Sequence, residues 1–211
     1  MKAILFDLDG TLTDSGEGIM NCAQLALDHY GIKVEDRSIL REFVGPPLHL
    51  SFAKFGVPPQ EIDNAITIYR SRYIPIGKFE NEPYPGIRQL LERLKESGYK
   101  LYVATSKPEN MSVEILEHFD LAKYFEIICG ATSDHARNTK ELVIQYLLEQ
   151  TGKDLDAVMV GDTVFDVVGA KAHGIPTVCV SWGYGIEKDM LDAGAIGIAH
   201  TMDELFDLLT K

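Results

Sequence analysis

Short apolar runs that end in polar residues or glycine recur along the chain and predict buried strands. Five runs of nearly continuous apolar character lie at residues 3–6, 101–104, 127–129, 157–160 and 177–180. Strands that are apolar on both faces are typical of a parallel sheet covered by helices on each side. The hydrophobic pattern therefore predicts five strands of such a sheet.

Helical periodicity fills the intervals between these runs. Ile87, Leu90, Leu91 and Leu94 recur at helical spacing, and Gly98 is the predicted stop signal of that helix. Two further apolar stripes comprise Leu142, Val143, Tyr146 and Leu147, and Leu205, Leu208 and Leu209. Strands that alternate with helices predict an α/β fold with a doubly wound parallel sheet.

Residues 14–82 break this alternation, because the hydrophobic pattern predicts no buried strand among them. They contain two apolar faces at helical spacing: Ile19, Cys22, Ala23, Ala26 and Tyr30, and Ile62, Ala65, Ile66 and Tyr69. The region ends in the segment NEPYPG at 81–86, which is typical of a linker. We therefore expect an inserted helical domain at 14–82 and a core domain formed by 1–13 and 83–211.

The net charge and the cysteine content indicate which partners the protein binds and in which cellular compartment it is found. The chain has 20 basic and 32 acidic residues, a net charge of −12, which argues against nucleic acid and anionic membranes as partners. No apolar stretch approaches the roughly 20 residues of a membrane span, and the N-terminus does not resemble a signal peptide. The three cysteines form no CxxC pair, so we expect a reduced, cytoplasmic protein.

Carboxylates follow two of the predicted strands. Asp7 and Asp9 end the first run, and Asp162 and Asp166 follow the fourth. Ligands of open α/β sheets bind beyond the carboxyl ends of strands, so these side chains are expected to converge there. Four neighbouring carboxylates require a cation, and oxygen ligands suit Mg²⁺. The structural alternatives are an Asp-Gly turn for the first pair and helix capping for the second, most plausibly at Asp166.

Groups able to hold a phosphate follow other strands. Thr105 and Ser106 end the second run, where hydroxyls and loop amides can bind an anion. Lys140 begins a predicted helix. Taken singly, helix capping and a solvated surface charge are the simpler interpretations of these residues.

The motifs together are more specific than any one of them. DLDGT at 7–11, Thr105, Lys140 and GDTVFD at 161–166 occur in the order of the four motifs of the haloacid dehalogenase superfamily. The whole chain resembles that superfamily. The insertion resembles the helical cap of its phosphoglycolate phosphatase-like branch. The resemblance implies a Rossmann-like core with an inserted α-helical cap domain.

The resemblance also implies roles for individual residues. Asp7 would be the nucleophile that forms an aspartyl-phosphate, and Asp9 the general acid and base. Mg²⁺ would be held by Asp7, the backbone carbonyl of Asp9, and Asp162, with Asp166 in support. The phosphoryl oxygens would be held by Thr105, Lys140 and the loop amides of Gly10 and Ser106.

Departures from related branches narrow the reaction. The superfamily's dehalogenases replace the second aspartate, which is present here as Asp9, so phosphoryl transfer is favoured. Ile19 stands about where phosphohexose mutases of the branch carry a histidine, and the loop 44–48 has no Arg or Lys. We therefore expect a monomeric or homodimeric phosphomonoester hydrolase for a small metabolite, such as phosphoglycolate or a nucleoside 5′-monophosphate. The alternatives are a phosphosugar mutase and a non-catalytic phosphate-binding member.

Overall fold

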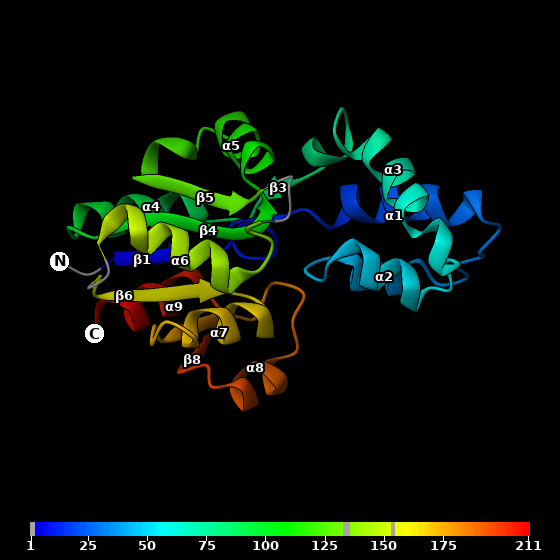
Figure 1. The fold of residues 1–211 in the computed structure, drawn as a ribbon. Helices are drawn as coiled ribbons and strands as arrows, with labels where there is room; N and C mark the ends of the chain where they lie inside the picture. Colours follow the sequence, from blue (N-terminus) through cyan, green and yellow to red (C-terminus); the bar gives the residue numbers. More distant parts are fainter. Residues whose placement is uncertain (1–2, 133–135, 153–154) are drawn as a thin grey trace. The chain divides into compact units, whose positions relative to one another are not determined.

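The computed structural model describes residues 3–132, 136–152 and 155–211, and the chain forms two compact units (Figure 1). The larger unit comprises Met1–Thr13 and Pro83–Lys211, and the smaller comprises Asp14–Glu82. The segments in which the chain passes from one unit to the other are the short strands β2 (Thr13–Asp14) and β3 (Glu82–Pro83), which pair with each other.

The larger unit contains a six-stranded sheet in which every neighbouring pair is parallel. Its strands are β1 (Ala3–Phe6), β4 (Lys100–Pro108), β5 (Ile127–Ala131), β6 (Ala157–Gly161), β7 (Thr177–Val180) and β8 (Gly197–Ala199), in the order β5-β4-β1-β6-β7-β8. All five predicted strands are present, so the α/β class is confirmed. The pattern missed β8, because three residues with one large apolar side chain are too short to show a periodicity.

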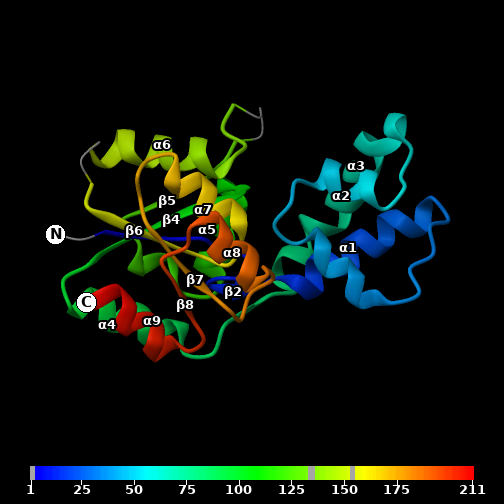
Figure 2. The ribbon, with the colours of Figure 1, turned by 90° about the horizontal axis from the view of Figure 1, so that it is seen from below.

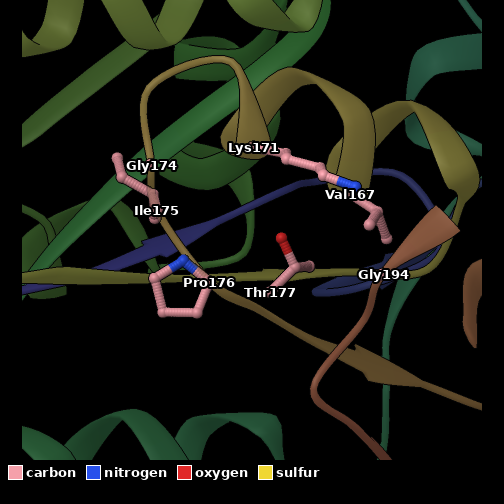
Figure 3. Close-up of a pocket in the computed structure, with 7 residues that line it drawn as sticks. All are labelled: Val167, Lys171, Gly174, Ile175, Pro176, Thr177 and Gly194. Carbon is pink, nitrogen blue, oxygen red and sulfur yellow. The ribbon is translucent and has the colours of Figure 1, made fainter.

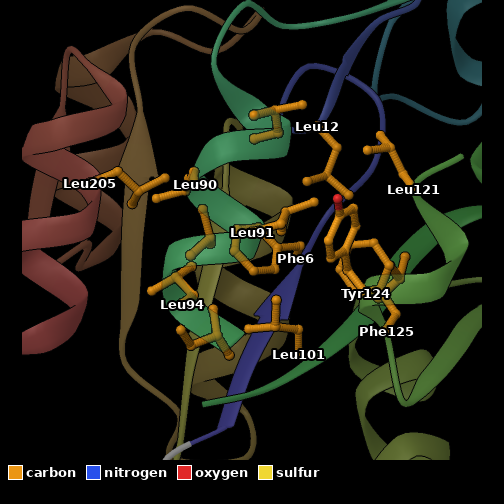
Figure 4. Packing of buried hydrophobic residues seen from close by; sticks show 14 of the residues in the cluster. Phe6, Leu12, Leu90, Leu91, Leu94, Leu101, Leu121, Tyr124, Phe125 and Leu205 are labelled. Atoms are coloured by element: carbon orange, nitrogen blue, oxygen red, sulfur yellow. The ribbon is translucent and has the colours of Figure 1, made fainter. Parts of the chain in front are cut away.

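Helices cover both faces of this sheet (Figures 1 and 2). α4 (Ile87–Glu96), α5 (Glu109–His118) and α9 (Met202–Thr210) contribute to the hydrophobic cluster on one face. Figure 4 shows this packing, with Phe6 of β1 among leucines of α4. α6 (Lys140–Thr151) and α7 (Val164–Lys171) cover the other face, and α8 (Glu187–Ala193) packs on α7.

The predicted apolar stripe is confirmed in α4, is rotated in α6, and is incomplete in α9, where Leu205 and Leu209 are buried but Leu208 is exposed. All four stripe residues of α4 are buried, but α6 buries Val143, Ile144 and Leu147 and leaves Tyr146 partly exposed. Lys140, one turn before Ile144, is buried on the same face. The buried face of α6 therefore includes a lysine in its first turn. A purely hydrophobic pattern does not predict that a charged residue lies on this face.

The smaller unit is helical apart from the single strand residues at its two ends. It contains α1 (Gly16–His29), α2 (Leu48–Lys54) and α3 (Ile62–Tyr73), with the 3₁₀ segments η1 (Arg37–Phe43), η2 (Pro59–Glu61) and η3 (Gly77–Phe79). Its interior includes edge-to-face and stacked aromatic rings, such as Phe43 on Phe52 and Tyr69 on Tyr73. Within the described residues, no helix is both long enough and apolar enough to span a membrane.

A small pocket of about 220 Å³ lies where α7 is connected to β7 (Figure 3). Val167, Lys171 and the beginning of β7 at Thr177 line it. Because β1, β6 and β7 are parallel, this pocket lies at the opposite end of β7 from the residues that follow the strands. It is therefore separate from the site described next.

Candidate active site

The predicted aspartates follow two central strands of the sheet. β1 and β6 are neighbours (Figure 1), and Asp7 and Asp162 come directly after them. The chain continues from β1 to β4 on one side and from β6 to β7 on the other. Such a reversal of strand order opens a crevice at the carboxyl ends of the strands, where α/β proteins bind ligands.

Three buried carboxylates lie close together at this edge of the sheet. Asp7, Asp162 and Asp166 each offer an oxygen within 4.8 Å of the other two. Burial raises the pKa of Asp7 to about 6; Lys140 opposes this rise and Asp166 adds to it. Burial, with the charges of Asp166 and Asp7, also raises the pKa of Asp162 well above its ordinary value. Full ionisation of this cluster therefore requires positive charge close by.

Lys140 supplies part of that charge from the first turn of α6. Its Nζ lies 2.7 Å from Asp7 Oδ1 and 2.7 Å from Asp166 Oδ1, and donates to the Ala104 carbonyl at 2.9 Å. Burial lowers the pKa of the Lys140 ammonium, but Asp166 and Asp7 raise it, and the net pKa lies above its ordinary value. The lysine therefore stays charged, in ion pairs with two carboxylates and in a hydrogen bond to one carbonyl.

The Asp166 carboxylate accepts hydrogen bonds from groups at the start of α7. Its Oδ2 accepts hydrogen bonds from the amides of Asp162 and Thr163, at 3.2 and 3.0 Å, and from the Thr163 hydroxyl at 2.9 Å. With Lys140 on the other oxygen, both oxygens already have partners. The capping interpretation of Asp166 is confirmed by the capping box that it forms with Thr163.

The loop after β7 encloses Asp162. The Tyr184 amide donates to Asp162 Oδ2 at 2.8 Å. A Cβ at Gly183 would overlap the Asp162 side chain, and a Cβ at Gly185 would overlap its carbonyl oxygen. From the sequence, residues 181–185 are interpreted as a plain connecting loop, with a segment that lines the active-site rim as the alternative. The signal that could have identified it is a pair of glycines, two residues apart, just beyond a strand, where another backbone approaches closely.

Gly10 and Thr11 approach the same carboxylate from β1. Gly10 has a φ of +85°, and a Cβ there would overlap the Asp162 carboxylate. Its amide donates to the Thr13 carbonyl at 2.8 Å, and the Thr11 hydroxyl donates to Asp162 Oδ1 at 3.3 Å. In this structure Gly10 thus permits close packing, and phosphate binding by its amide stays a prediction.

The end of β4 brings one of its two predicted hydroxyl groups to the cluster. Thr105 is buried and its hydroxyl hydrogen-bonds to Asp7, which lowers the pKa of that carboxyl against the dominant effect of burial. Ser106 is exposed on the alternate side of the strand. The strand itself continues to Pro108, beyond the predicted end at 104, with an irregular register between Ala104 and Pro108.

Asp9 has a partner that sequence reasoning missed. Lys107 Nζ donates to both oxygens of the Asp9 carboxylate, at 2.7 and 3.0 Å. The predicted aspartates therefore form ion pairs with two different lysines. Asp7 and Asp166 pair with Lys140, and Asp9 pairs with Lys107. The signal that could have identified Lys107 is its position two residues after Thr105 on the same strand, since alternate residues share a face.

The donor set fits a divalent cation that prefers oxygen ligands. Asp7 and Asp162 follow adjacent strands, and their carboxylates meet at one point. Asp166 is less suited to direct ligation because its oxygens already bind Lys140 and the start of α7. Burial raises the pKa values of Asp7 and Asp162, so a cation bound between them would favour the ionised forms of both carboxyl groups.

A Rossmann-like sheet with a buried aspartate cluster at its strand-order reversal is an arrangement found in α/β enzymes. A profile described as haloacid dehalogenase-like hydrolase matches residues 4–180, and the chain belongs to that family. The family predicted from the motifs is therefore confirmed, as is its assignment as a phosphatase-type enzyme.

Three related proteins illustrate the range of this family. The tyrosine-protein kinase PtkA of Mycobacterium tuberculosis is 41% identical over 212 residues, which cover 99% of this chain and 72% of PtkA. A 5′-nucleotidase of Pseudomonas aeruginosa is 40% identical over 89% of this chain and 86% of its own. The crystal structure of a predicted phosphatase from Clostridium acetobutylicum superposes with a TM-score of 0.93 at 44% identity, covering 99% and 97% of the two chains.

Proposed function

We propose that this protein is a Mg²⁺-dependent hydrolase of small phosphomonoesters that works through an aspartyl-phosphate on Asp7. The observation that carries the proposal is the position of Asp7: a buried carboxylate beside Asp162, with one oxygen held 2.7 Å from the Lys140 ammonium. A carboxylate fixed at the carboxyl end of a central strand is poised to attack a ligand in the crevice.

The chain's own groups account for both steps of the reaction. In the first step an Asp7 oxygen bonds to phosphorus, the bond from phosphorus to the leaving oxygen breaks, and the Asp9 carboxyl gives that oxygen a proton. In the second step a water bonds to phosphorus, its proton passes to the Asp9 carboxylate, and the bond to Asp7 breaks. Inorganic phosphate leaves, and both aspartates return to their starting states.

Lys140 and Thr105 are proposed to stabilise the phosphoryl group during both steps. Lys140 is charged and buried at the nucleophile, and the Thr105 hydroxyl hydrogen-bonds to Asp7. Positive charge in a buried site offsets the repulsion between a carboxylate and an anionic ester. The amides of Gly10 and Ser106 are proposed to add hydrogen bonds when substrate is present.

Asp7, Asp162 and the backbone carbonyl of Asp9 are the proposed magnesium ligands, with Asp166 supporting them through Lys140 and the start of α7. Bound Mg²⁺ would neutralise the charge of the carboxylates and polarise the phosphoryl group. The residues 14–82 are proposed to act as the cap domain and 1–13 with 83–211 as the phosphatase core.

The cellular setting is also proposed. The cysteines Cys22, Cys129 and Cys179 are all free and buried, as suits a reducing compartment such as the cytoplasm. The net charge of −12 disfavours nucleic acid and anionic membranes as partners. The protein is proposed to act as a monomer or homodimer.

The test is phosphate release from phosphoglycolate, a set of nucleoside 5′-monophosphates and an aryl phosphate, each with Mg²⁺ and with excess EDTA. We expect turnover that EDTA abolishes and that added Mg²⁺ restores. Acid quenching during turnover, followed by mass spectrometry, should find the added phosphoryl group on Asp7. A phosphorylated residue other than Asp7, or turnover unaffected by EDTA, would contradict the proposal.

A further inference from the structure

Lys107 is a buried lysine that the proposed reaction does not use. Its ammonium lies 2.7 Å from Asp9 Oδ2, and the two side chains are only 5% and 16% exposed. The Lys123–Asp120 pair offers a contrast on the surface of the same unit, with side chains that are 53% and 66% exposed. Exposed ion pairs contribute little to the stability of a fold. A buried lysine loses its hydration, and the ion pair with a neighbouring carboxylate offsets that cost.

The backbone of β4 determines where this ammonium lies. Thr105 and Lys107 are two residues apart on an extended segment and are both buried, while Ser106 between them is exposed. Pro108 follows Lys107 and restricts it to extended backbone angles. The Lys107 amide also donates to the Thr105 hydroxyl oxygen at 3.3 Å, so the segment is tied to the residue that contacts Asp7.

A close approach of β5 braces the same segment. A Cβ at Gly130 would overlap the Lys107 carbonyl and the backbone of Glu109. The Glu109 side chain accepts from the Gly130 amide at 3.2 Å and pairs with Arg137. The position of Lys107 is therefore set by packing between two strands.

We propose that Lys107 is a positioning residue that holds the Asp9 carboxyl in the orientation needed for its proton transfers. This inference rests on the proposed function. By contacting both Asp9 oxygens, the ammonium restricts rotation of the carboxyl group, while each oxygen keeps a lone pair for proton exchange. Lys140 serves the nucleophile Asp7, and Lys107 serves the acid and base Asp9. Neither the attack on phosphorus nor the leaving of phosphate requires contact with Lys107.

The effect of Lys107 should depend on how much the leaving group needs a proton. p-Nitrophenolate departs readily without one, whereas the more basic phenolate of phenyl phosphate requires proton donation as the ester bond breaks. The two esters are similar in shape, so a lysine that bound the phosphoryl group would affect both equally. The ratio of their kcat/KM values is measured on one sample and does not depend on the fraction of folded enzyme.

The experiment measures kcat/KM for both esters, with Mg²⁺, in the wild type and in Lys107→Met and Lys107→Arg. We expect Lys107→Met to lose at least about tenfold more activity with phenyl phosphate than with p-nitrophenyl phosphate, within the range of general acid catalysis. Lys107→Arg keeps the charge and the donors, and should restore most of the difference. The matched control is Lys123→Met, which removes a surface lysine and should leave both values unchanged.

A double-mutant cycle identifies Asp9 as the group through which Lys107 acts. In an Asp9→Asn background, Lys107→Met should cause no further loss that depends on the leaving group. Equal losses with both esters in the wild-type background would overturn the positioning role and indicate that Lys107 binds the phosphoryl group or stabilises the fold. If the wild type hydrolyses neither ester and also releases no phosphate from phosphoglycolate or the nucleoside 5′-monophosphates, the proposed function itself fails, and the role of Lys107 fails with it.

Discussion

Lys140 Nζ lies 2.7 Å from Asp166 Oδ1, and this ion pair joins the first turn of α6 to the first turn of α7. Because Lys140 also contacts Asp7, the anchoring of Asp166 by the start of α7 restricts the ammonium that contacts the proposed nucleophile. Asp166 is therefore linked to Asp7 through the lysine. Asp7, Asp162 and Asp166 lie close together but have different partners, which is the basis for the different roles proposed for them.

Asp7→Asn should abolish turnover while the fold survives. The amide is nearly isosteric with the carboxylate but is a far poorer nucleophile, and loss of a nucleophile can reduce a rate by on the order of 10⁶-fold. The measurement is kcat with the aryl phosphate, together with the thermal midpoint and circular dichroism. Asp207→Asn, at an exposed carboxylate of α9, is the matched control. A folded Asp7→Asn protein with a tenth of the wild-type activity would show that another group attacks phosphorus.

Asp162→Ala should raise the Mg²⁺ concentration needed for half-maximal activity far more than Asp166→Ala does. Among the described residues, the oxygens of Asp162 accept from one amide and from one hydroxyl at 3.3 Å, whereas those of Asp166 contact Lys140 and the start of α7. Asp166→Ala should instead lower the thermal midpoint, because it removes a capping box and leaves Lys140 with one carboxylate fewer. Metal titrations and melting curves of both variants decide this, and a larger metal effect at Asp166 would reverse the two roles.

The convergence of the motifs was predictable because parallel strands end at the same edge of a sheet. Asp7 and Asp162 are far apart in the sequence, yet each follows an apolar run that could be identified locally. The hydrophobic pattern could not predict contacts between residues that are not marked by an adjacent apolar run. Lys107 lies 98 positions from Asp9, and its position two residues after Thr105 indicates a shared face but not the carboxylate that it contacts.

The burial of Asp162 by the loop after β7 was missed for a related reason. The amide of Tyr184 and the missing side chain of Gly183 matter only because that loop folds against the end of β6. A local pattern reports the backbone freedom of a glycine but not the group that approaches it. The same holds for β8, whose three residues become a strand only by pairing with β7.

The Mg²⁺ affinity should weaken as the pH falls below about 6. Burial raises the pKa of Asp7 from 3.8 to about 6, so below that pH a proton must leave before the cation binds. For one proton the half-saturating Mg²⁺ concentration should rise by up to about tenfold for each pH unit. Titrations between pH 5 and pH 8 measure this. An affinity that does not change over this range would contradict the assignment of Asp7 as a ligand.

The raised pKa of Asp7 also makes the stability of the fold depend on pH. A carboxyl whose pKa is raised on folding favours the folded state at low pH, and this contribution is lost as the pH rises from 3.8 through about 6. Mg²⁺ should therefore raise the melting temperature more at pH 7.5 than at pH 5.5. Asp7→Asn does not titrate at this position, and its melting temperature with Mg²⁺ should depend less on pH.

Gly183→Ala should reduce Mg²⁺ affinity by about 10- to 100-fold, the size of effect seen for groups that orient metal ligands. A Cβ at Gly183 would overlap the Asp162 side chain and force it to move. Gly197→Ala is the matched control, because a Cβ there would make only ordinary contacts with Leu208, at 3.6 Å. Metal titrations of both variants test this. A normal affinity in Gly183→Ala would mean that the loop can move without disturbing Asp162.

Small phosphate esters should be better substrates than phosphorylated macromolecules, and the discrimination against polyanions should depend on salt. The phosphorus atom must reach Asp7, whose side chain is only 12% exposed, so little room is available around the ester. The net charge of −12 repels a polyanion over a distance that shortens as ionic strength rises. We expect kcat/KM for a 5′-phosphorylated oligonucleotide to lie at least about tenfold below that for a nucleoside 5′-monophosphate at low salt, and the gap to narrow with added salt.

A phosphotyrosine peptide of neutral net charge separates the effect of size from the effect of charge. If the shape of the site limits access, the peptide stays a poor substrate at every salt concentration. A peptide or oligonucleotide that exceeds every small ester by tenfold would show that the site is built for macromolecules, and that repulsion by the net charge does not determine which substrates reach Asp7.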